Sequence, residues 1–172
     1  MLVLPMIALK IIAGIGITAL CGAVGYKAGR RYTLRDTVLS DFILMCDYMR
    51  GDIAFFHKPM KIMIEGYMDK FCPETAEILR TYLSCLDTGT DAAALREKIP
   101  AAYLTPDDRE YVVQLLSVLG KSDEEAQVES IGAFRLTLAD KQKESAANRK
   151  KYSSLYPRLG LLAGACAALI IL

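Results

Sequence analysis

The chain has 172 residues and a formal net charge of +1. Counted with Gly and without Tyr, roughly 55% of its residues are apolar, against about 45–50% in soluble domains, and the excess lies at the two ends of the chain. This composition excludes an intrinsically disordered chain and a coiled-coil rod, and only five scattered cysteines exclude a disulfide scaffold.

The charges are distributed unevenly along the chain. Residues 1–31 hold four basic and no acidic residues, residues 141–158 hold six basic and one acidic, and residues 32–140 hold eleven basic and nineteen acidic. Basic flanks beside apolar ends are typical of a domain tethered to a membrane at both ends. The acidic middle argues against nucleic acid as the main partner.

The first apolar segment resembles a secretory signal, but its charges are in the wrong order. A signal peptide carries its positive charge before the apolar region and a small-residue cleavage site after it. Here Lys10 interrupts the apolar run, whereas Lys27, Arg30 and Arg31 follow it. We therefore expect residues 1–26 to form an uncleaved transmembrane helix whose C-terminal end faces the cytoplasm.

The last apolar segment is short. Residues 159–172 carry no charge and would span about 21 Å as a helix, against about 30 Å of hydrocarbon. A buried core helix is the alternative, but a core helix would not explain why the last four residues are all apolar and present no polar face. We favour a short transmembrane helix over residues 158–172. Basic residues precede it and follow the first apolar segment, so both segments have their positive flank toward the middle of the chain. Residues 27–157 then form one cytosolic domain with basic juxtamembrane flanks, and both termini lie on the far side of the membrane.

The middle of the chain predicts helices and contains no convincing alternating strand. An amphipathic stripe indicates a long helix capped by Thr33 and ended by Lys58-Pro59. Short helices are expected to follow over residues 60–71, 73–86 and 91–102.

The last two helices have the clearest start signals. Thr105 followed by Pro106 predicts a capped helix that ends at Gly120, and Ser122 opens a capping box for a final helix. That helix continues through a polar neck at residues 142–151. The predicted fold class is therefore all-α, a helical bundle between an N-terminal and a short C-terminal transmembrane helix.

The search for catalytic, cofactor or metal sites is negative. Residues 14–19 imitate a dinucleotide-binding motif but lie inside an apolar helix with no strand before them. His57 is the single histidine, and no serine or cysteine motif accompanies it. Cys46, Cys72 and Cys85 are interpreted as small apolar fillers. Five methionines at helical spacing could form a soft binding groove or belong to the core, and we favour the core. They are Met45, Met49, Met60, Met63 and Met68.

Several segments together resemble stage III sporulation protein AB of endospore-forming bacteria. They are the anchor ending in basic residues, Leu34-Arg35 opening a long helix, the turn at Pro59-Met60, residues 115–131 with Gly120, Asp123, Gln127 and Ile131, and the closing run from Arg158 through Gly160 to Gly164. The resemblance covers nearly the whole chain. The family usually has Thr-Pro-Leu where this chain has Lys58-Pro59-Met60, so the hydroxyl cap of that helix is missing here.

The resemblance implies a non-catalytic scaffold in the channel between mother cell and forespore. The family is similar to the helical cytoplasmic domains of the inner-membrane platform protein of type II secretion systems. Expected partners are the secretion-type ATPase, stage III sporulation protein AA, other proteins of the same complex, and membrane lipid, with no nucleic acid, small-molecule substrate or cofactor. The expected location is the mother-cell membrane around the forespore, with the main domain facing the cytoplasm. A generic double-anchored adaptor unrelated to sporulation and a small membrane enzyme are the alternatives.

A cluster of acidic residues is the candidate partner-binding surface. Helix capping uses one or two carboxylates per helix start, whereas these residues are more numerous. We expect them to form an electronegative patch for basic groups on the ATPase, and a solvated helix face is the alternative. The set comprises Asp107, Asp108, Glu110, Asp123, Glu124, Glu125 and Glu129.

Overall fold

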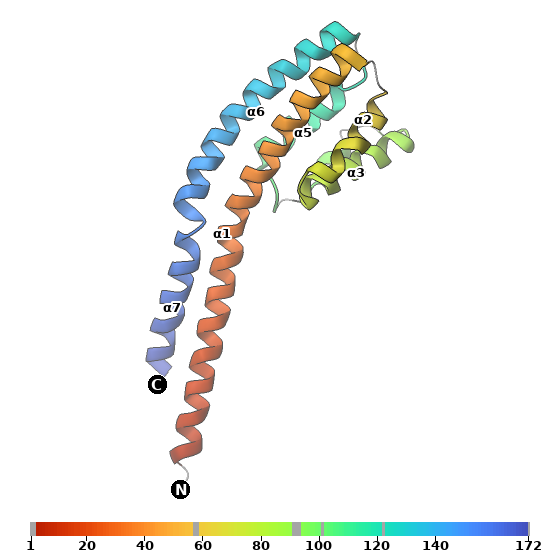
Figure 1. Ribbon diagram of the computed structural model, residues 1–172. Helices are drawn as coiled ribbons and strands as arrows, with labels where there is room; N and C mark the ends of the chain where they lie inside the picture. The colour runs from red at the N-terminus through yellow and green to blue at the C-terminus, as the bar shows by residue number, and fades with distance from the viewer. Residues whose placement is uncertain (1–2, 57–58, 91–93, 101, 122, 172) are drawn as a thin grey trace. The chain divides into compact units, whose positions relative to one another are not determined.

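The computed structural model describes residues 3–56, 59–90, 94–100, 102–121 and 123–171, and most of these are helical with no strand among them. The all-α prediction is therefore confirmed. The chain divides into two compact units, which we name unit 1 and unit 2. Unit 1 comprises Met1–Thr33 and Ala146–Leu172, and unit 2 comprises Leu34–Ser145. The colour ramp of Figure 1 allows each to be followed along the chain.

The first helix is longer than the sequence predicts. Helix α1 runs without interruption over Val3–Phe56, so the prediction that Thr33 caps a new helix is wrong. The physical reason is that residues 27–35 contain one glycine and no proline, while Lys, Ala, Arg and Leu favour helix. The N–H groups that a cap would satisfy are already bonded inside a continuous helix.

Shorter helices complete unit 2. In chain order they are α2 (Met60–Tyr67), the 3-10 helix η1 (Met68–Lys70), α3 (Pro73–Asp87), α4 (Leu95–Lys98) and α5 (Pro106–Val118). Helix α6 (Glu124–Tyr152) begins in unit 2 and runs through residues 142–151, which confirms that the polar neck continues the helix. Helix α7 (Leu155–Ile171) belongs to unit 1.

Local signals explain where α5 and α6 begin. The backbone N–H of Asp108 donates to the Thr105 hydroxyl oxygen over 3.2 Å, which confirms the predicted cap of α5. Gly120 has a φ of 76°, a left-handed conformation that glycine adopts without a steric penalty. Asp123 caps α6 by accepting from the Ala126 N–H over 3.1 Å. Ser122 and His57 lie outside the described residues.

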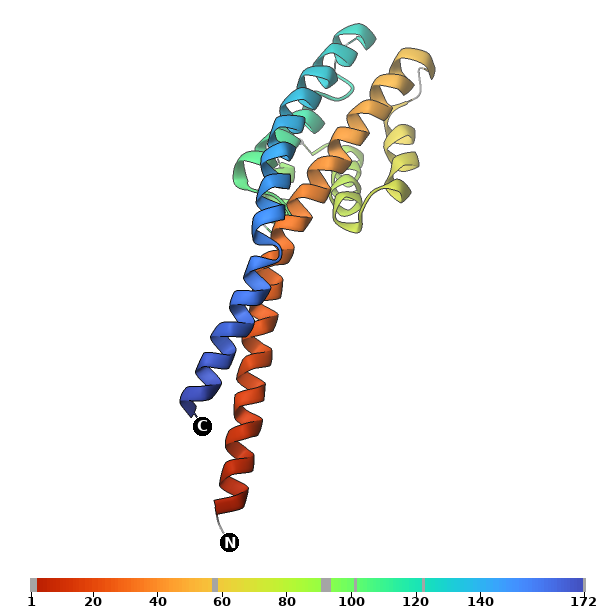
Figure 2. The ribbon, with the colours of Figure 1, turned by 60° about the vertical axis from the view of Figure 1, so that its left-hand side comes forward.

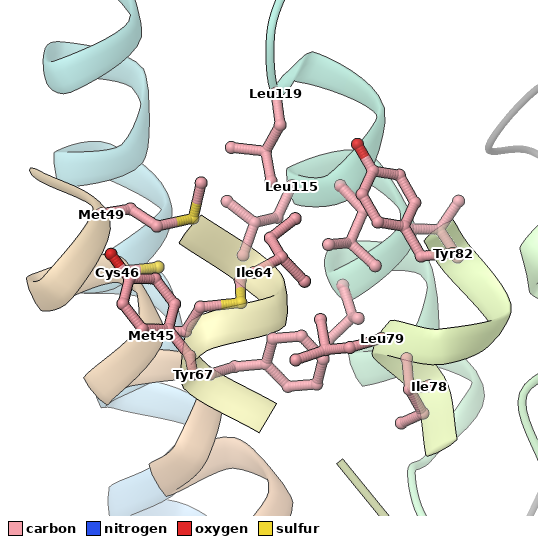
Figure 3. Packing of buried hydrophobic residues seen from close by; sticks show 14 of the residues in the cluster. Met45, Cys46, Met49, Ile64, Tyr67, Ile78, Leu79, Tyr82, Leu115 and Leu119 are labelled. Carbon is pink, nitrogen blue, oxygen red and sulfur yellow. The ribbon is translucent and has the colours of Figure 1, made fainter. Parts of the chain in front are cut away.

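The core of unit 2 lies between one face of α1 and helices α2, α3, α5 and α6. Figure 3 shows side chains from four of these elements pointing toward one another. Met45, Met49 and Met63 are at most 3% exposed, which confirms that they belong to the core, whereas Met60 and Met68 are only partly buried and pack against its edge. Cys46 and Cys85 are buried as well, as predicted for apolar fillers. Burial raises the pKa of the Cys46 thiol to about 12, so this thiol is protonated at neutral pH.

Unit 1 is held together by close backbone contact. Helices α1 and α7 run side by side in opposite directions in both ribbon views (Figures 1 and 2). Four glycines face the backbone of the opposite helix so closely that a Cβ atom would collide with it. The distances from such a Cβ to the nearest facing atom are 2.5 Å at Gly25, 2.7 Å at Gly29, 2.5 Å at Gly160 and 2.7 Å at Gly164. The facing atoms belong, in the same order, to Tyr156, Ser153, Cys21 and Thr18. Small residues at such spacing let transmembrane helices approach each other.

Among the residues that the structure describes, two helical stretches are long and apolar enough to cross a membrane, Ile12–Phe55 and Glu124–Ile170. Only 17% and 6% of their most apolar windows are buried inside the protein, whereas the core helix of a soluble protein is mostly buried. These exposed apolar windows favour association with a membrane. Helix α7 has 17 residues, or about 25 Å of helix, so it is slightly shorter than an average hydrocarbon layer.

Candidate partner-binding surface

The seven acidic residues singled out in the sequence fall into two groups with different surroundings. The three on α5 are each engaged in an ion pair within unit 2. Asp107 pairs with Lys141, and Glu110 pairs with Arg96. Their charge is therefore largely neutralised inside the protein.

Asp108 does not belong to an exposed patch. Its side chain has no exposed area, and it accepts hydrogen bonds from the Arg35 Nε over 2.6 Å and the Arg35 Nη2 over 3.3 Å. Lys141 Nζ lies 3.6 Å from Asp108 Oδ1. This burial corrects the expectation that Asp108 contributes to a docking surface, because a carboxylate next to an inward-facing arginine of α1 is drawn into the interior.

The ion pair of Asp108 also sets its protonation. Burial alone would raise the pKa of this carboxyl, but the hydrogen bonds from Arg35 and Thr105 and the charges of Arg35 and Lys141 outweigh it and lower the pKa below its usual value. Asp108 is therefore a structural residue that joins α5 to α1 and stays ionised at neutral pH.

The group on α6 is different, because its side chains are exposed. Asp123 is used as the N-cap, and Glu124 and Glu125 lie in the first helical turn, where carboxylates interact favourably with the helix dipole. Glu125 and Glu129 are one helical turn apart and have no ion-pair partner among the described residues. These two carboxylates remain available to a positively charged partner.

Glu125 and Glu129 line a surface groove between α1 and α6. Gly132 and Ala133 are among its lining residues, and the Cζ of Arg50 lies 3.7 Å from where a Cβ of Gly132 would be. The remaining lining residues are Val128, Arg135 and Leu136. The groove thus combines small residues with charged walls.

One contact and one exposed side chain further define this groove. Arg135 Nε donates to Asp47 Oδ1 of α1 over 2.5 Å, which ties α6 to α1 along one edge. Leu136 is 65% exposed, so the groove offers an apolar side chain beside two free carboxylates. Such a surface fits a segment that presents one apolar side chain flanked by basic ones.

Sequence reasoning found part of this surface and missed the rest. Glu125 and Glu129 were expected, whereas Arg50, Gly132 and Leu136 were not. Leu136 had a usable signal, because it is an apolar residue outside the stripe of Ile131 and Leu138. Arg50 had none, since it is 82 positions before Gly132 in the chain and only the fold brings the two together.

No group of three or more potential metal ligands occurs among the residues that the structure describes. Comparison with curated proteins gives no match, and comparison with solved structures gives none either. A family described as stage III sporulation protein AB matches residues 10–172, which is nearly the whole chain. The chain therefore belongs to the stage III sporulation protein AB family, and its role lies in sporulation.

Proposed function

We propose that this protein is a non-catalytic membrane scaffold of the channel between mother cell and forespore. Its two apolar helices hold it in the mother-cell membrane around the forespore, and unit 2 faces the cytoplasm. There it binds the cytoplasmic ATPase of the complex, stage III sporulation protein AA, as the platform protein of a type II secretion system binds its own ATPase.

The groove on α6 is the proposed contact, and its charge supports the proposal. Glu125 and Glu129 are exposed and form no ion pair with any described residue, and Leu136 lines the same groove. An ATPase segment with basic and apolar side chains would replace the water around these groups. Such rim charges act mainly on the association rate and weaken with salt.

Binding kinetics test the contact directly. The full chain in nanodiscs would be immobilised, and the association rate of the ATPase measured at several salt concentrations. The double variant E125K/E129K should associate about 10-fold or more slowly at low salt, with a flattened salt dependence. The control E65K/E97K makes the same charge change at exposed carboxylates elsewhere in unit 2 and should keep the parent rate.

A second variant separates the apolar contact from the charges. Leu136→Asp should raise the dissociation rate more than it lowers the association rate, because a buried apolar contact acts after encounter. If E125K/E129K associates as fast as the parent chain at low salt, the carboxylates are only a solvated helix face.

Topology is a separate part of the proposal. Cysteines placed at positions 88 and 121, in a background without native cysteines, should react with an impermeant maleimide only after the membrane is permeabilised. A cysteine at position 172 should react without permeabilisation. Labelling of 88 or 121 in intact cells would place unit 2 outside the cytoplasm.

The alternative is a double-anchored adaptor without a link to the ATPase. It predicts the same topology but no binding of the ATPase by the parent chain. Co-purification of the two proteins from sporulating cells therefore separates the alternatives.

A further inference from the structure

We propose that unit 1 binds anionic phospholipid, with the headgroup phosphates held by a band of basic residues and one acyl chain lying in the apolar groove between α1 and α7. We use the name basic band for the Lys and Arg side chains within residues 27–31 and 149–158. The proposal concerns the membrane side of the molecule and does not depend on the ATPase.

The charge of unit 1 is the first observation. Its residues include eight Lys and Arg and no Asp or Glu, whereas residues 34–145 include 13 Lys and Arg and 20 Asp and Glu. Seven of the eight basic residues lie in the basic band. Unit 1 contains no carboxylate side chain, so its concentration of positive charge favours an anionic partner. The four members on which the proposal rests are exposed: Lys27, Lys150, Lys151 and Arg158.

Helix packing brings the two halves of this band side by side. Gly25 faces Tyr156 and Gly29 faces Ser153, so residues 25–29 of α1 lie beside residues 153–156. Lys27 lies at this level, Lys150 and Lys151 lie on its unit-2 side, and Arg158 lies on its apolar side, so the basic residues span about 12 Å along the helix axis. Phosphates of one leaflet can contact both helices at once.

Three tyrosines mark the same level. The ring of Tyr32 lies 5.1 Å from that of Tyr152 and 5.8 Å from that of Tyr156, measured between centroids. Tyrosines are enriched where the hydrocarbon meets the headgroups. The aromatic cluster and the basic band thus indicate the same interface.

The groove supplies the second part of a phospholipid site. It is lined almost entirely by apolar atoms of both helices, from Gly14, Ile15, Thr18 and Ala19 of α1 and from Leu161, Ala165, Ala168 and Leu169 of α7. Its single hydroxyl, on Thr18, is already used, because it donates to the Gly14 carbonyl oxygen over 2.9 Å. A polar ligand would find no hydrogen-bonding group there.

The depth of the groove matches an acyl chain below a bound headgroup. Its α1 residues lie 8 to 13 positions before Lys27, which is about 12–20 Å along a helix. Half of the hydrocarbon layer is about 15 Å thick. An acyl chain whose phosphate is held at Lys27 would therefore reach the groove.

Spin-labelled lipids test the headgroup contact. The full chain would be placed in phosphatidylcholine bilayers with trace phosphatidylglycerol or phosphatidylcholine labelled near the headgroup, at carbon 5. We expect the motionally restricted fraction to indicate a preference of about fivefold for phosphatidylglycerol, or ~1 kcal/mol, which falls with salt. The variant K27Q/K150Q/K151Q/R158Q should abolish the preference, so that the two lipids bind about equally well.

A matched variant controls for loss of positive charge in general. K61Q/R80Q/K121Q/K143Q removes the same number of exposed charges from unit 2 and should keep the preference. An equal loss in both variants, or a preference retained by the first, overturns the proposal. Circular dichroism of each variant should show the helical content of the parent chain.

Lipid labelled deep in its acyl chain tests occupancy of the groove separately from the headgroup contact. Ala165→Phe should reduce the restricted fraction of lipid labelled at carbon 14 while leaving the preference at carbon 5 unchanged. An unchanged carbon-14 signal would show that no acyl chain occupies the groove. Inorganic phosphate should displace the lipid no better than sodium chloride of equal ionic strength. Stronger displacement by phosphate would identify a free phosphate site instead of a lipid site.

Discussion

Unit 1 and unit 2 are both helical, but different kinds of contact hold them together. In unit 2, large side chains such as Phe42, Leu79 and Tyr82 fill the interior and are at most 1% exposed. In unit 1, glycines remove side chains so that two backbones meet directly. The difference follows from the solvent, because side-chain burial gains free energy only where the alternative is water. The comparison indicates that one chain uses a packing rule suited to each of its surroundings.

The largest effect is expected at the buried ion pair of unit 2. Asp108→Ala should lower the free energy of unfolding of the fragment 32–152 by about 3–5 kcal/mol, because the charge of Arg35 would remain without its buried partner. Urea unfolding followed by circular dichroism measures the loss. Asp87→Ala breaks an ion pair with Lys61 whose side chains are 59% and 50% exposed, and should change the stability far less. Equal losses would contradict the role given to Asp108.

A core truncation should come next. Leu116 is 1% exposed, so Leu116→Ala should cost about 2–5 kcal/mol in the same fragment through lost burial and a cavity. Leu136→Ala removes the same atoms from a side chain that is 65% exposed and should stay within about 0.5 kcal/mol of the parent. The prediction presupposes that the fragment folds as a soluble helical domain. A fragment soluble only in detergent would contradict our division of the chain.

Unit 1 should respond to added rather than removed atoms. Gly160→Leu should cost about 1–3 kcal/mol or more and separate α1 from α7, because a Cβ there would lie 2.5 Å from the Cys21 carbonyl oxygen. Nitroxides at positions 15 and 169 of the full chain in nanodiscs would report a longer and broader distance distribution. Gly16→Leu is the matched control, since nothing lies within 4 Å of its Cβ position. A similar change in both variants would show that the helices are not packed through Gly160.

The smallest effect is a dependence on pH. The pKa of Asp108 is lowered in the folded protein, so its ionised form contributes stability at pH values above the unfolded pKa, about 3.9, and this contribution is lost as the pH falls through the folded pKa. The difference in unfolding free energy between the parent and Asp108→Asn should therefore be full at pH 7 and shrink below about pH 4. A difference that stays constant down to pH 2 would contradict the ionised pair.

The sequence predicted features that depend on neighbouring residues. The start of α5 at Thr105 and Pro106 and the end before Gly120 are determined by capping and backbone conformation within a few positions. The methionine stripe was assigned to the core because helical spacing identifies one face. The junction near Thr33 was misjudged, since a cap residue can equally lie inside a continuous helix.

Features that depend on distant residues were not predictable. Asp107 and Asp108 are adjacent and chemically alike, yet one is exposed and the other has no exposed area. The distinction arises from Arg35, 73 positions away, and nothing local to Asp108 indicates it. The same reasoning explains why the carboxylates of the candidate surface were found while the Arg50 wall of the groove was not.

The glycine contacts of unit 1 have a consequence for insertions and deletions. Each residue of an α-helix turns the following ones by about 100°, so a single residue inserted between Cys21 and Gly25 would carry Gly25 and Gly29 away from α7. An insertion of seven residues, close to two whole turns, would nearly restore the facing direction but shift the contacts by about 10 Å along the axis. Among relatives, this pair of helices should therefore vary in composition on its outer faces while keeping the number of residues between its glycines, whereas the turns of unit 2 are free to change in length.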